Sequence, residues 1–219
     1  MALKTEKKYL SKKDKAIYTA ALMIAGIVLC VFFYYLDKRI ILWFRIFDDS
    51  HSLLGKYLEM LDPVIGFLSH GATLMVFSII LCVAGGIWNR RLYEVGKFLA
   101  AGFLSSGFAA QILKYSIGRA RPRLTNETFF YGLSMKDKYH SFPSGHTTVA
   151  FCFAYILSQF FPRYCTIFYS IACLVGFERV EDLKHFPSDV LAGALIGIIV
   201  GRLLIAAIYH RDTEFETLS

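Results

Sequence analysis

Residues 189–209 read DVLAGALIGIIVGRLLIAAIY and carry one charge, that of Arg202, after the opening aspartate. A helix needs about 20 consecutive, mainly apolar residues to cross the hydrocarbon core of a bilayer. The stretch therefore predicts a transmembrane helix, in which the Arg202 side chain is expected to snorkel inward.

Five more stretches upstream have the same character, and the whole sequence is 56% hydrophobic and 19% charged. A soluble domain averages roughly 45–50% apolar and about 25% charged residues. The pattern predicts an all-α, polytopic membrane protein with one domain over residues 1–219 and six transmembrane helices. The six stretches are Ala16–Leu36, Val64–Trp88, Val95–Gly118, Ser144–Phe161, Cys165–Arg179 and Asp189–Tyr209.

The N-terminal residues 1–15 contain six lysines that precede the first stretch. Because lysine-rich flanks favour the cytoplasmic side, we expect this segment and the tail 210–219 to be cytoplasmic. No small-residue cleavage site follows the first stretch, so we interpret it as a retained helix. Loops 37–63, 119–143 and 180–188 then lie outside. The net charge is +7, but the lysines and arginines form no basic helix and no patch interleaved with aromatic residues. This distribution excludes a nucleic-acid partner.

Loop 37–63 mixes apolar and charged residues and contains Trp43. This pattern is typical of one or two helices that lie in the membrane interface, with Trp43 near the lipid headgroups. A surface-lying connector is an equally good interpretation.

Small residues recur every four positions in two of the stretches, and such stripes let helices approach closely in lipid. We expect the stripes to join helices within one chain, while a homodimer through Gly193, Gly197 and Gly201 remains an alternative. The second stripe consists of Gly102, Ser106 and Ala110.

Three short segments carry the chemistry: KYSIGRARP at 114–122, PSGH at 143–146 and RVEDLKHFPSD at 179–189. Each lies at the edge of an apolar stretch, and the predicted topology places all three on the same side of the membrane. Cations, histidines, a hydroxyl and a carboxylate at the membrane edge indicate a pocket for a multiply charged anion attached to a lipid.

His185 and Asp189 are four residues apart, so on a helical turn they share one face. We expect Asp189 to hydrogen-bond the imidazole, which holds one tautomer and leaves the other nitrogen free as a nucleophile. Asp189 is equally well placed to cap the following helix.

The PSGH segment precedes an apolar helix. Backbone N–H groups at a helix N-terminus, with the Ser144 hydroxyl and Gly145, suit an anion, and His146 in the first turn can donate a proton to a leaving oxygen. The alternative is a helix cap followed by a histidine at the membrane edge.

Lys114, Arg121 and Arg179 are expected to form a cationic shell, since guanidinium forks match phosphate oxygens. The alternative is that these cations are snorkelling anchors. We interpret a further set of cations as anchors or weak steering charges: Arg119, Arg123, Lys136 and Lys138. Of the other histidines, His140 is expected near the pocket mouth, and structural roles are assigned to His51, His70 and His210.

The five cysteines form no C-x-x-C pair and no metal-ligand spacing, so they indicate no metal site. We interpret them as small hydrophobic residues.

Taken together, the three segments closely resemble the signature of type 2 phosphatidic acid phosphatases. These are integral-membrane lipid phosphatases related to vanadium haloperoxidases and glucose-6-phosphatase. The resemblance covers about the C-terminal half of the chain, from Lys114 onward. It implies metal-independent phosphoryl transfer without a cofactor.

The resemblance also implies roles for individual residues. His185 would attack phosphorus and form a phosphohistidine, Asp189 would orient it, and His146 would protonate the leaving group. The phosphate oxygens would be held by Lys114, Arg121, Ser144, Gly145 and Arg179. The family commonly has serine before the arginine of the third segment, where this chain has Glu178. We expect Glu178 to point away from the phosphate or to pair with a cation such as Lys184.

The expected function is removal of phosphate from a membrane lipid at the periplasmic face of a bacterial inner membrane. Undecaprenyl diphosphate, phosphatidylglycerophosphate, phosphatidic acid and lipid A 1-phosphate all remain candidate substrates. The alternative is a transporter or a non-catalytic protein that binds lipid phosphate. The apolar stretches exclude a soluble vanadate-dependent oxidase.

Overall fold

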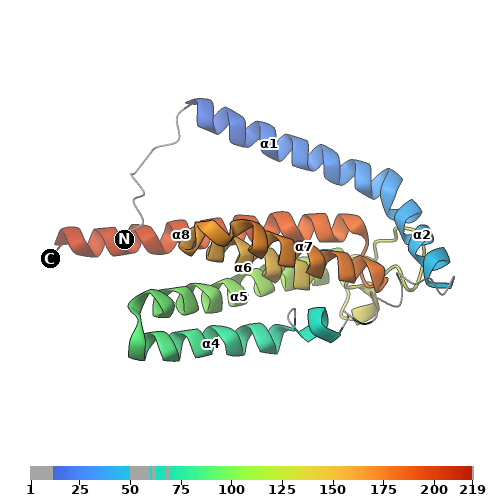
Figure 1. Cartoon of the computed structure of the whole chain (residues 1–219). Helices are drawn as coiled ribbons and strands as arrows, with labels where there is room; N and C mark the ends of the chain where they lie inside the picture. Colours follow the sequence, from blue (N-terminus) through green and yellow to red (C-terminus); the bar gives the residue numbers. More distant parts are fainter. Residues whose placement is uncertain (1–11, 50–59, 61–62, 68–69, 219) are drawn as a thin grey trace.

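The computed structural model describes residues 12–49, 60, 63–67 and 70–218, and its regular structure there is helical (Figure 1). The all-α prediction is confirmed, and each of the six apolar stretches overlaps with one long helix. The long helix in the second stretch begins at Gly71 rather than at Val64, and the first stretch ends in a short helical turn, Phe32–Leu36. The helices are α1 (Lys12–Val31), α2 (Asp37–Asp49), α4 (Gly71–Trp88), α5 (Arg90–Ile117), α6 (Gly145–Phe160), α7 (Cys165–Glu181) and α8 (Pro187–Leu218). Short helical turns are η1 (Phe32–Leu36), η2 (Asp137–Tyr139) and η3 (Pro162–Tyr164).

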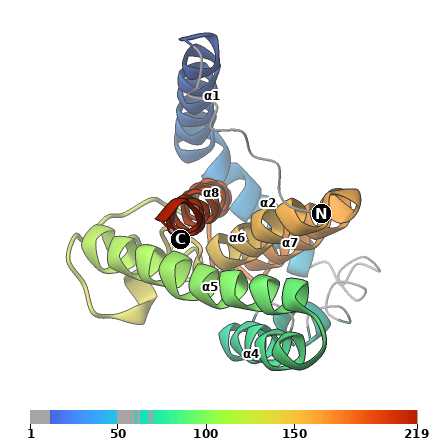
Figure 2. The ribbon, with the colours of Figure 1, turned by 90° about the vertical axis from the view of Figure 1, so that its left-hand side faces the viewer.

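Helices α4 to α8 form a bundle, whereas α1 stands away from it over most of its length (Figures 1 and 2). The loops between α5 and α6 and between α7 and α8 meet at one end of the bundle, where α2 crosses. The α4–α5 turn lies at the opposite end. The three chemistry-bearing segments are therefore gathered at one end, as the alternating topology predicts.

Four helical segments in the described part of the chain are long and apolar enough to cross a membrane: Thr19–Ile46, Gly71–Trp88, Arg90–Ile117 and Pro187–Ala207. Helices α6 and α7 have 16 and 17 residues, and at 1.5 Å per residue they are about 24–26 Å long. A hydrocarbon core is about 30 Å thick. The count of six membrane crossings therefore stays a prediction.

Local sequence explains where the helices begin and end. The Asn89 side chain accepts a hydrogen bond from the Arg91 N–H and caps α5. Gly118 ends α5 in the left-handed conformation, with φ of 59°, which glycine adopts without strain. Pro187 opens α8, where a missing N–H is harmless. These ends set where each functional loop departs from the bundle.

The glycine stripe of α8 packs against α6 of the same chain. A Cβ atom at Gly197 would lie 2.2 Å from the Thr148 carbonyl oxygen, and one at Gly193 would lie 2.7 Å from the Ser144 carbonyl oxygen. The stripe therefore joins helices within one chain, and a homodimer contact through it would need a surface that α6 already covers. The Gly102 stripe similarly packs α5 against α6 at Cys152.

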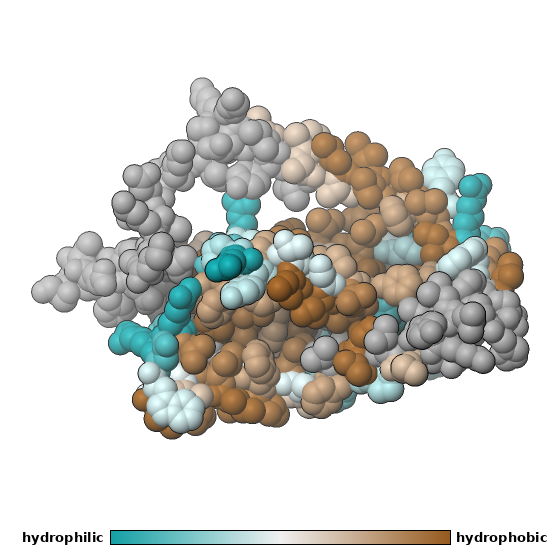
Figure 3. Space-filling model, in the orientation of Figure 1, coloured by the Kyte–Doolittle hydropathy of each residue, from teal (hydrophilic) through white to brown (hydrophobic). Residues whose placement is uncertain are grey.

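Apolar side chains cover much of the outer surface, which Figure 3 shows as brown over the bundle and α1. Their exposure is large: Ile27 on α1 is 64% exposed, and Phe108 on α5 is 69% exposed. Such a surface in water would favour association, but facing lipid tails it is stable. This supports an integral membrane protein.

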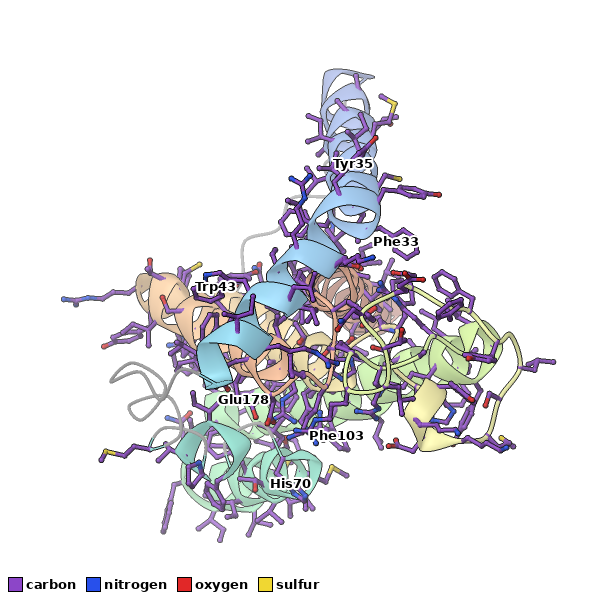
Figure 4. All side chains as sticks on the ribbon, turned by 90° about the vertical axis from the view of Figure 1, so that its right-hand side faces the viewer. Phe33, Tyr35, Trp43, His70, Phe103 and Glu178 are labelled. Carbon is purple, nitrogen blue, oxygen red and sulfur yellow. The ribbon has the colours of Figure 1, made fainter. Side chains whose placement is uncertain are left out.

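Helix α2 is more than a surface connector. Ile41 and Phe44 are buried against Val180 and Phe186, so one face of α2 packs on the end of the bundle. Trp43 lies on the other side and is 53% exposed (Figure 4). The remainder of the predicted interfacial segment, residues 50–59 and 61–62, lies outside the described residues, as does His51.

Candidate active site

The loop after α7 brings His185 to the buried centre of the site. His185 is 2% exposed, and its backbone N–H donates to the Arg179 carbonyl oxygen at 3.0 Å. Its Nδ1 atom lies 2.6 Å from the Ser141 carbonyl oxygen. A carbonyl only accepts hydrogen bonds, so Nδ1 carries the proton and Nε2 presents a lone pair.

The expected hydrogen bond between His185 and Asp189 is not formed. Nδ1 of His185 and Oδ2 of Asp189 are 3.8 Å apart, which is too long for a hydrogen bond. The Ser141 carbonyl fixes the tautomer instead, and Asp189 acts on the imidazole as a nearby negative charge. Sequence reasoning missed Ser141 because its contribution here comes from the backbone.

Asp189 is fully buried and accepts hydrogen bonds from three directions. Oδ2 accepts from the Ser141 hydroxyl at 2.5 Å and from the Phe186 N–H at 2.8 Å. Oδ1 accepts from the guanidinium of Arg119. The bond to Phe186 caps the start of α8, so the capping interpretation holds together with the place beside His185.

The second segment supplies the N-terminus of α6, whose first backbone N–H groups have no partner within the helix. Ser144 precedes the helix, and its hydroxyl oxygen accepts from the Thr147 hydroxyl at 2.9 Å. A Cβ at Gly145 would lie 3.5 Å from Nζ of Lys114, so the ammonium and the helix N-terminus are adjacent. These groups present positive charge to one space, where an anion is stabilised.

His146, in the first turn of α6, lies within electrostatic range of Lys114, Arg179 and His185. The first, second and third segments thus meet, as their separate sequence patterns predict. His185 in turn lies within electrostatic range of Lys114 and Arg121.

Two of the expected phosphate-binding arginines are paired with carboxylates. Arg121 donates from Nη2 to Oδ1 of Asp137 at 2.8 Å and from Nε to the Asp137 carbonyl oxygen at 3.0 Å. Arg179 and Glu178, both buried, form a two-point ion pair. Glu178 therefore pairs with a cation as expected, but the partner is Arg179, because Lys184 pairs with Asp182.

One other expectation for this loop was wrong. Arg119 is not a solvated anchor or steering charge, because it is 0% exposed and contacts Asp189. His140, expected near the pocket mouth, is 5% exposed and directs Nε2 to the Ser134 carbonyl oxygen at 2.8 Å. Asp37, which the sequence did not single out, pairs with Arg119.

Burial lowers the pKa of His185 from its ordinary 6.5 to about 4, with Lys114 and Arg121 adding to this and Asp189 opposing it. Between pH 6.5 and about pH 4, the imidazole of His185 is protonated in the unfolded chain and neutral in the folded chain. The resulting contribution to stability is complete above pH 6.5 and is lost as the pH falls toward 4. Its size is about 3 kcal/mol.

We therefore expect acid to destabilise the wild-type protein more steeply than His185→Gln. The measurement is the Tm of both proteins in detergent at about pH 7 and about pH 4.5. Parallel pH profiles of the two proteins would show that His185 does not titrate in this way.

Comparison with known proteins gives a consistent match. A family model for the PAP2 superfamily matches residues 95–212. The chain is 37% identical over 120 residues to a lipid A 1-phosphatase of Rhizobium etli, covering 53% of this chain and 51% of that protein. It is 32% identical over 110 residues to an undecaprenyl-diphosphatase of Sulfolobus acidocaldarius, covering 49% and 52%. The chain thus spans about half the length of these curated relatives.

Two solved structures share the fold. The crystal structure of Aquifex aeolicus LpxE matches with a TM-score of 0.57 and 28% identity, covering 75% of this chain and 93% of that one. A PAP2-type phosphatidylglycerolphosphate phosphatase from Bacillus subtilis matches with a TM-score of 0.65 and 23% identity, covering 88% and 96%.

Proposed function

The chain belongs to the PAP2 superfamily, and from this membership and the geometry of the site we propose that it hydrolyses phosphate from a membrane lipid at the extracytoplasmic face. The observation that carries the proposal is the position of His185. Its Nδ1 donates a hydrogen bond to the Ser141 carbonyl oxygen, so Nε2 carries the free lone pair. The charges of Lys114 and Arg121 act on the same imidazole.

The reaction has two displacement steps. In the first, Nε2 of His185 attacks phosphorus, the bond from phosphorus to the lipid oxygen breaks, and His146 gives that oxygen its proton. In the second, a water molecule attacks the phosphorus of the phosphohistidine, and His146 takes up a proton from that water. Phosphate leaves and His185 returns to its starting state.

Cationic groups would stabilise the negative charge of the transferring phosphoryl group. Lys114 and the N-terminus of α6 are already directed to one space. Arg121 and Arg179 would bind phosphate oxygens as well, which requires them to exchange or share their contacts with Asp137 and Glu178. Asp189 supports the positive charge that develops on His185.

The substrate we propose is a lipid that carries a terminal phosphate or diphosphate. The similarity to a lipid A 1-phosphatase and to an undecaprenyl-diphosphatase supports testing lipid A 1-phosphate and undecaprenyl diphosphate first. Phosphatidylglycerophosphate and phosphatidic acid complete the series. The test is phosphate release by the purified protein from each lipid in detergent. A protein that binds these lipids and releases no phosphate would be a binding protein or transporter, which would contradict the proposal.

Phosphate release is expected to continue unchanged in the presence of EDTA. Lys114 and the N-terminus of α6 already supply positive charge of the kind that a metal ion would bring to the phosphate. Among the described residues, no three His, Cys, Asp or Glu side chains gather to hold one. The measurement compares initial rates with EDTA and with added Mg²⁺, and a strict requirement for the metal would contradict this mechanism.

A further inference from the structure

The buried guanidinium of Arg119 makes four hydrogen bonds near the site. Its Nη1 donates to Oγ of Ser188 at 2.7 Å and to Oδ1 of Asp189. Its Nη2 donates to Oδ2 of Asp37 at 2.7 Å and to Oγ1 of Thr128 at 3.2 Å. Each guanidinium terminus therefore bonds one carboxylate and one hydroxyl.

Aromatic rings enclose the same guanidinium. The ring centres of Phe186, Phe33 and Phe130 lie 4.1, 4.8 and 5.8 Å from its central carbon. A cation over ring faces is stabilised, and rings also exclude water that would weaken the ion pairs. Figure 4 shows Phe33 on the helical turn after α1, next to the loop that follows α5.

Asp37 connects this guanidinium to the first helices of the chain. It is 1% exposed and lies at the start of α2. Its Oδ1 accepts from the Ser188 N–H at 2.9 Å, and its Oδ2 accepts from the Ser188 hydroxyl at 2.5 Å. Asp37 thus holds both Arg119 and the residue next to Asp189.

A continuous series of contacts leads from Arg119 to the imidazole. The Ser141 N–H donates to the Arg119 carbonyl oxygen at 3.0 Å, and the Ser141 hydroxyl donates to Asp189, the partner of the Arg119 guanidinium. Ser141 is therefore attached to Arg119 directly and through Asp189. The Ser141 carbonyl oxygen then holds Nδ1 of His185 at 2.6 Å.

We infer that Asp37 and Arg119 are positioning residues that hold the His185 imidazole in its attacking orientation through Ser141 and Asp189. The inference rests on the proposed function. Asp37 fixes the guanidinium, the guanidinium fixes one oxygen of Asp189, and the other oxygen fixes Ser141. Asp37 and Arg119 are 1% and 0% exposed, so neither is expected to touch the lipid phosphate.

The network has a structural role as well, because it attaches α2 to α8, and the test must separate the two roles. A residue that only stabilises the fold changes Tm and leaves the turnover of folded protein intact. A positioning residue changes kcat and leaves KM nearly intact, because misplacing a reacting group by about 1 Å lowers the rate about 100-fold.

The decisive variant is Asp37→Asn, which keeps the size of the side chain and removes its charge. Activity is measured on the lipid phosphate that the wild-type enzyme hydrolyses, at a temperature well below the Tm of each protein, per amount of folded protein. We expect kcat to fall about 10- to 100-fold, with KM and the inhibition constant of inorganic phosphate within about twofold of wild type.

The matched control is Glu127→Gln, another carboxylate-to-amide change in the same region. Glu127 is exposed and pairs with Lys38, next to Asp37. Its kcat, KM and Tm are expected to remain at wild-type values. Should Asp37→Asn fail to fold, Ser188→Ala removes the hydroxyl that bridges Arg119 and Asp37, and a milder loss of kcat is expected.

The outcomes separate the inference from the proposed function. A folded Asp37→Asn or Ser188→Ala with wild-type kcat, whatever its Tm, overturns the inference and leaves the phosphatase assignment intact. A wild-type protein without phosphate release from any lipid overturns the proposed function itself. A matching loss of kcat and rise of KM would place Asp37 in substrate binding and would also contradict the inference.

Discussion

Replacing His185 with alanine is expected to lower kcat for phosphate release by about four orders of magnitude or more, because it removes the proposed nucleophile. The residual rate would come from the cations and the N-terminus of α6. The measurement is the initial rate of phosphate release by purified protein in detergent, together with acid-labile phosphate bound to the protein after rapid quenching. Wild type is expected to carry this phosphate, and the variant is not.

The matched control is His70→Ala. His70 precedes α4, makes no side-chain capping bond and is exposed. Its rate and its bound phosphate are expected to equal those of wild type. Sustained turnover by His185→Ala would show that another group attacks phosphorus, and the phosphohistidine would have to be abandoned.

A large effect on folding is expected from Gly197→Ala in α8. The new Cβ would lie 2.2 Å from the Thr148 carbonyl oxygen, 2.9 Å from the Cys152 backbone nitrogen and 3.1 Å from Cβ of Phe151. Two of these atoms belong to the α6 backbone, which cannot turn aside as a side chain does. Overpacking of this kind destabilises by about 1–3 kcal/mol or more. We therefore expect a clear fall in Tm and in the yield of folded protein.

Gly107→Ala in α5 is the control for this change. A Cβ at Gly107 meets no atom within 4 Å, and alanine favours a helix over glycine by up to about 1 kcal/mol. The Tm of this variant is expected to equal or exceed that of wild type. If the two variants melted alike, α6 and α8 would not approach as closely as the structure has them.

The apolar stretches predicted the helices well because hydrophobic length and local end signals are both local properties. Gly118 ended α5 and Ser144 preceded α6, where their conformational preferences place them. The divergence of α1 from the bundle depends instead on tertiary packing. No pattern within residues 12–31 distinguishes a helix that joins a bundle from one that faces lipid.

The meeting of the three segments could be predicted, because it depends on residue types that the motifs contain. The contacts of Arg119 and Ser141 were missed, because they depend on the folded geometry. Lys114 and Gly145 come together as their motifs predict. Arg119 has the sequence signature of a solvated cation at a helix end, and its partner Asp37 is 82 residues away. The Ser141 carbonyl is a backbone acceptor that every residue type has, so the identity of the residue does not indicate its role.

Glu178 illustrates a different limit. Neighbouring positions on a helix point in different directions, so a pair formed by residues 178 and 179 is not expected from helical spacing. Burial changes the outcome, because an unpaired carboxylate away from water is costly and Arg179 is the cation within reach.

The attachment of α2 to the bundle has a consequence for chimeric proteins. The family match covers residues 95–212, whereas Asp37 lies upstream of it. A hybrid that joined this C-terminal half to the leading helices of another phosphatase would leave Arg119 with one carboxylate where it now has two. A hybrid of two members of this family is therefore expected to be active only when the residues at positions 37 and 119 come from the same parent.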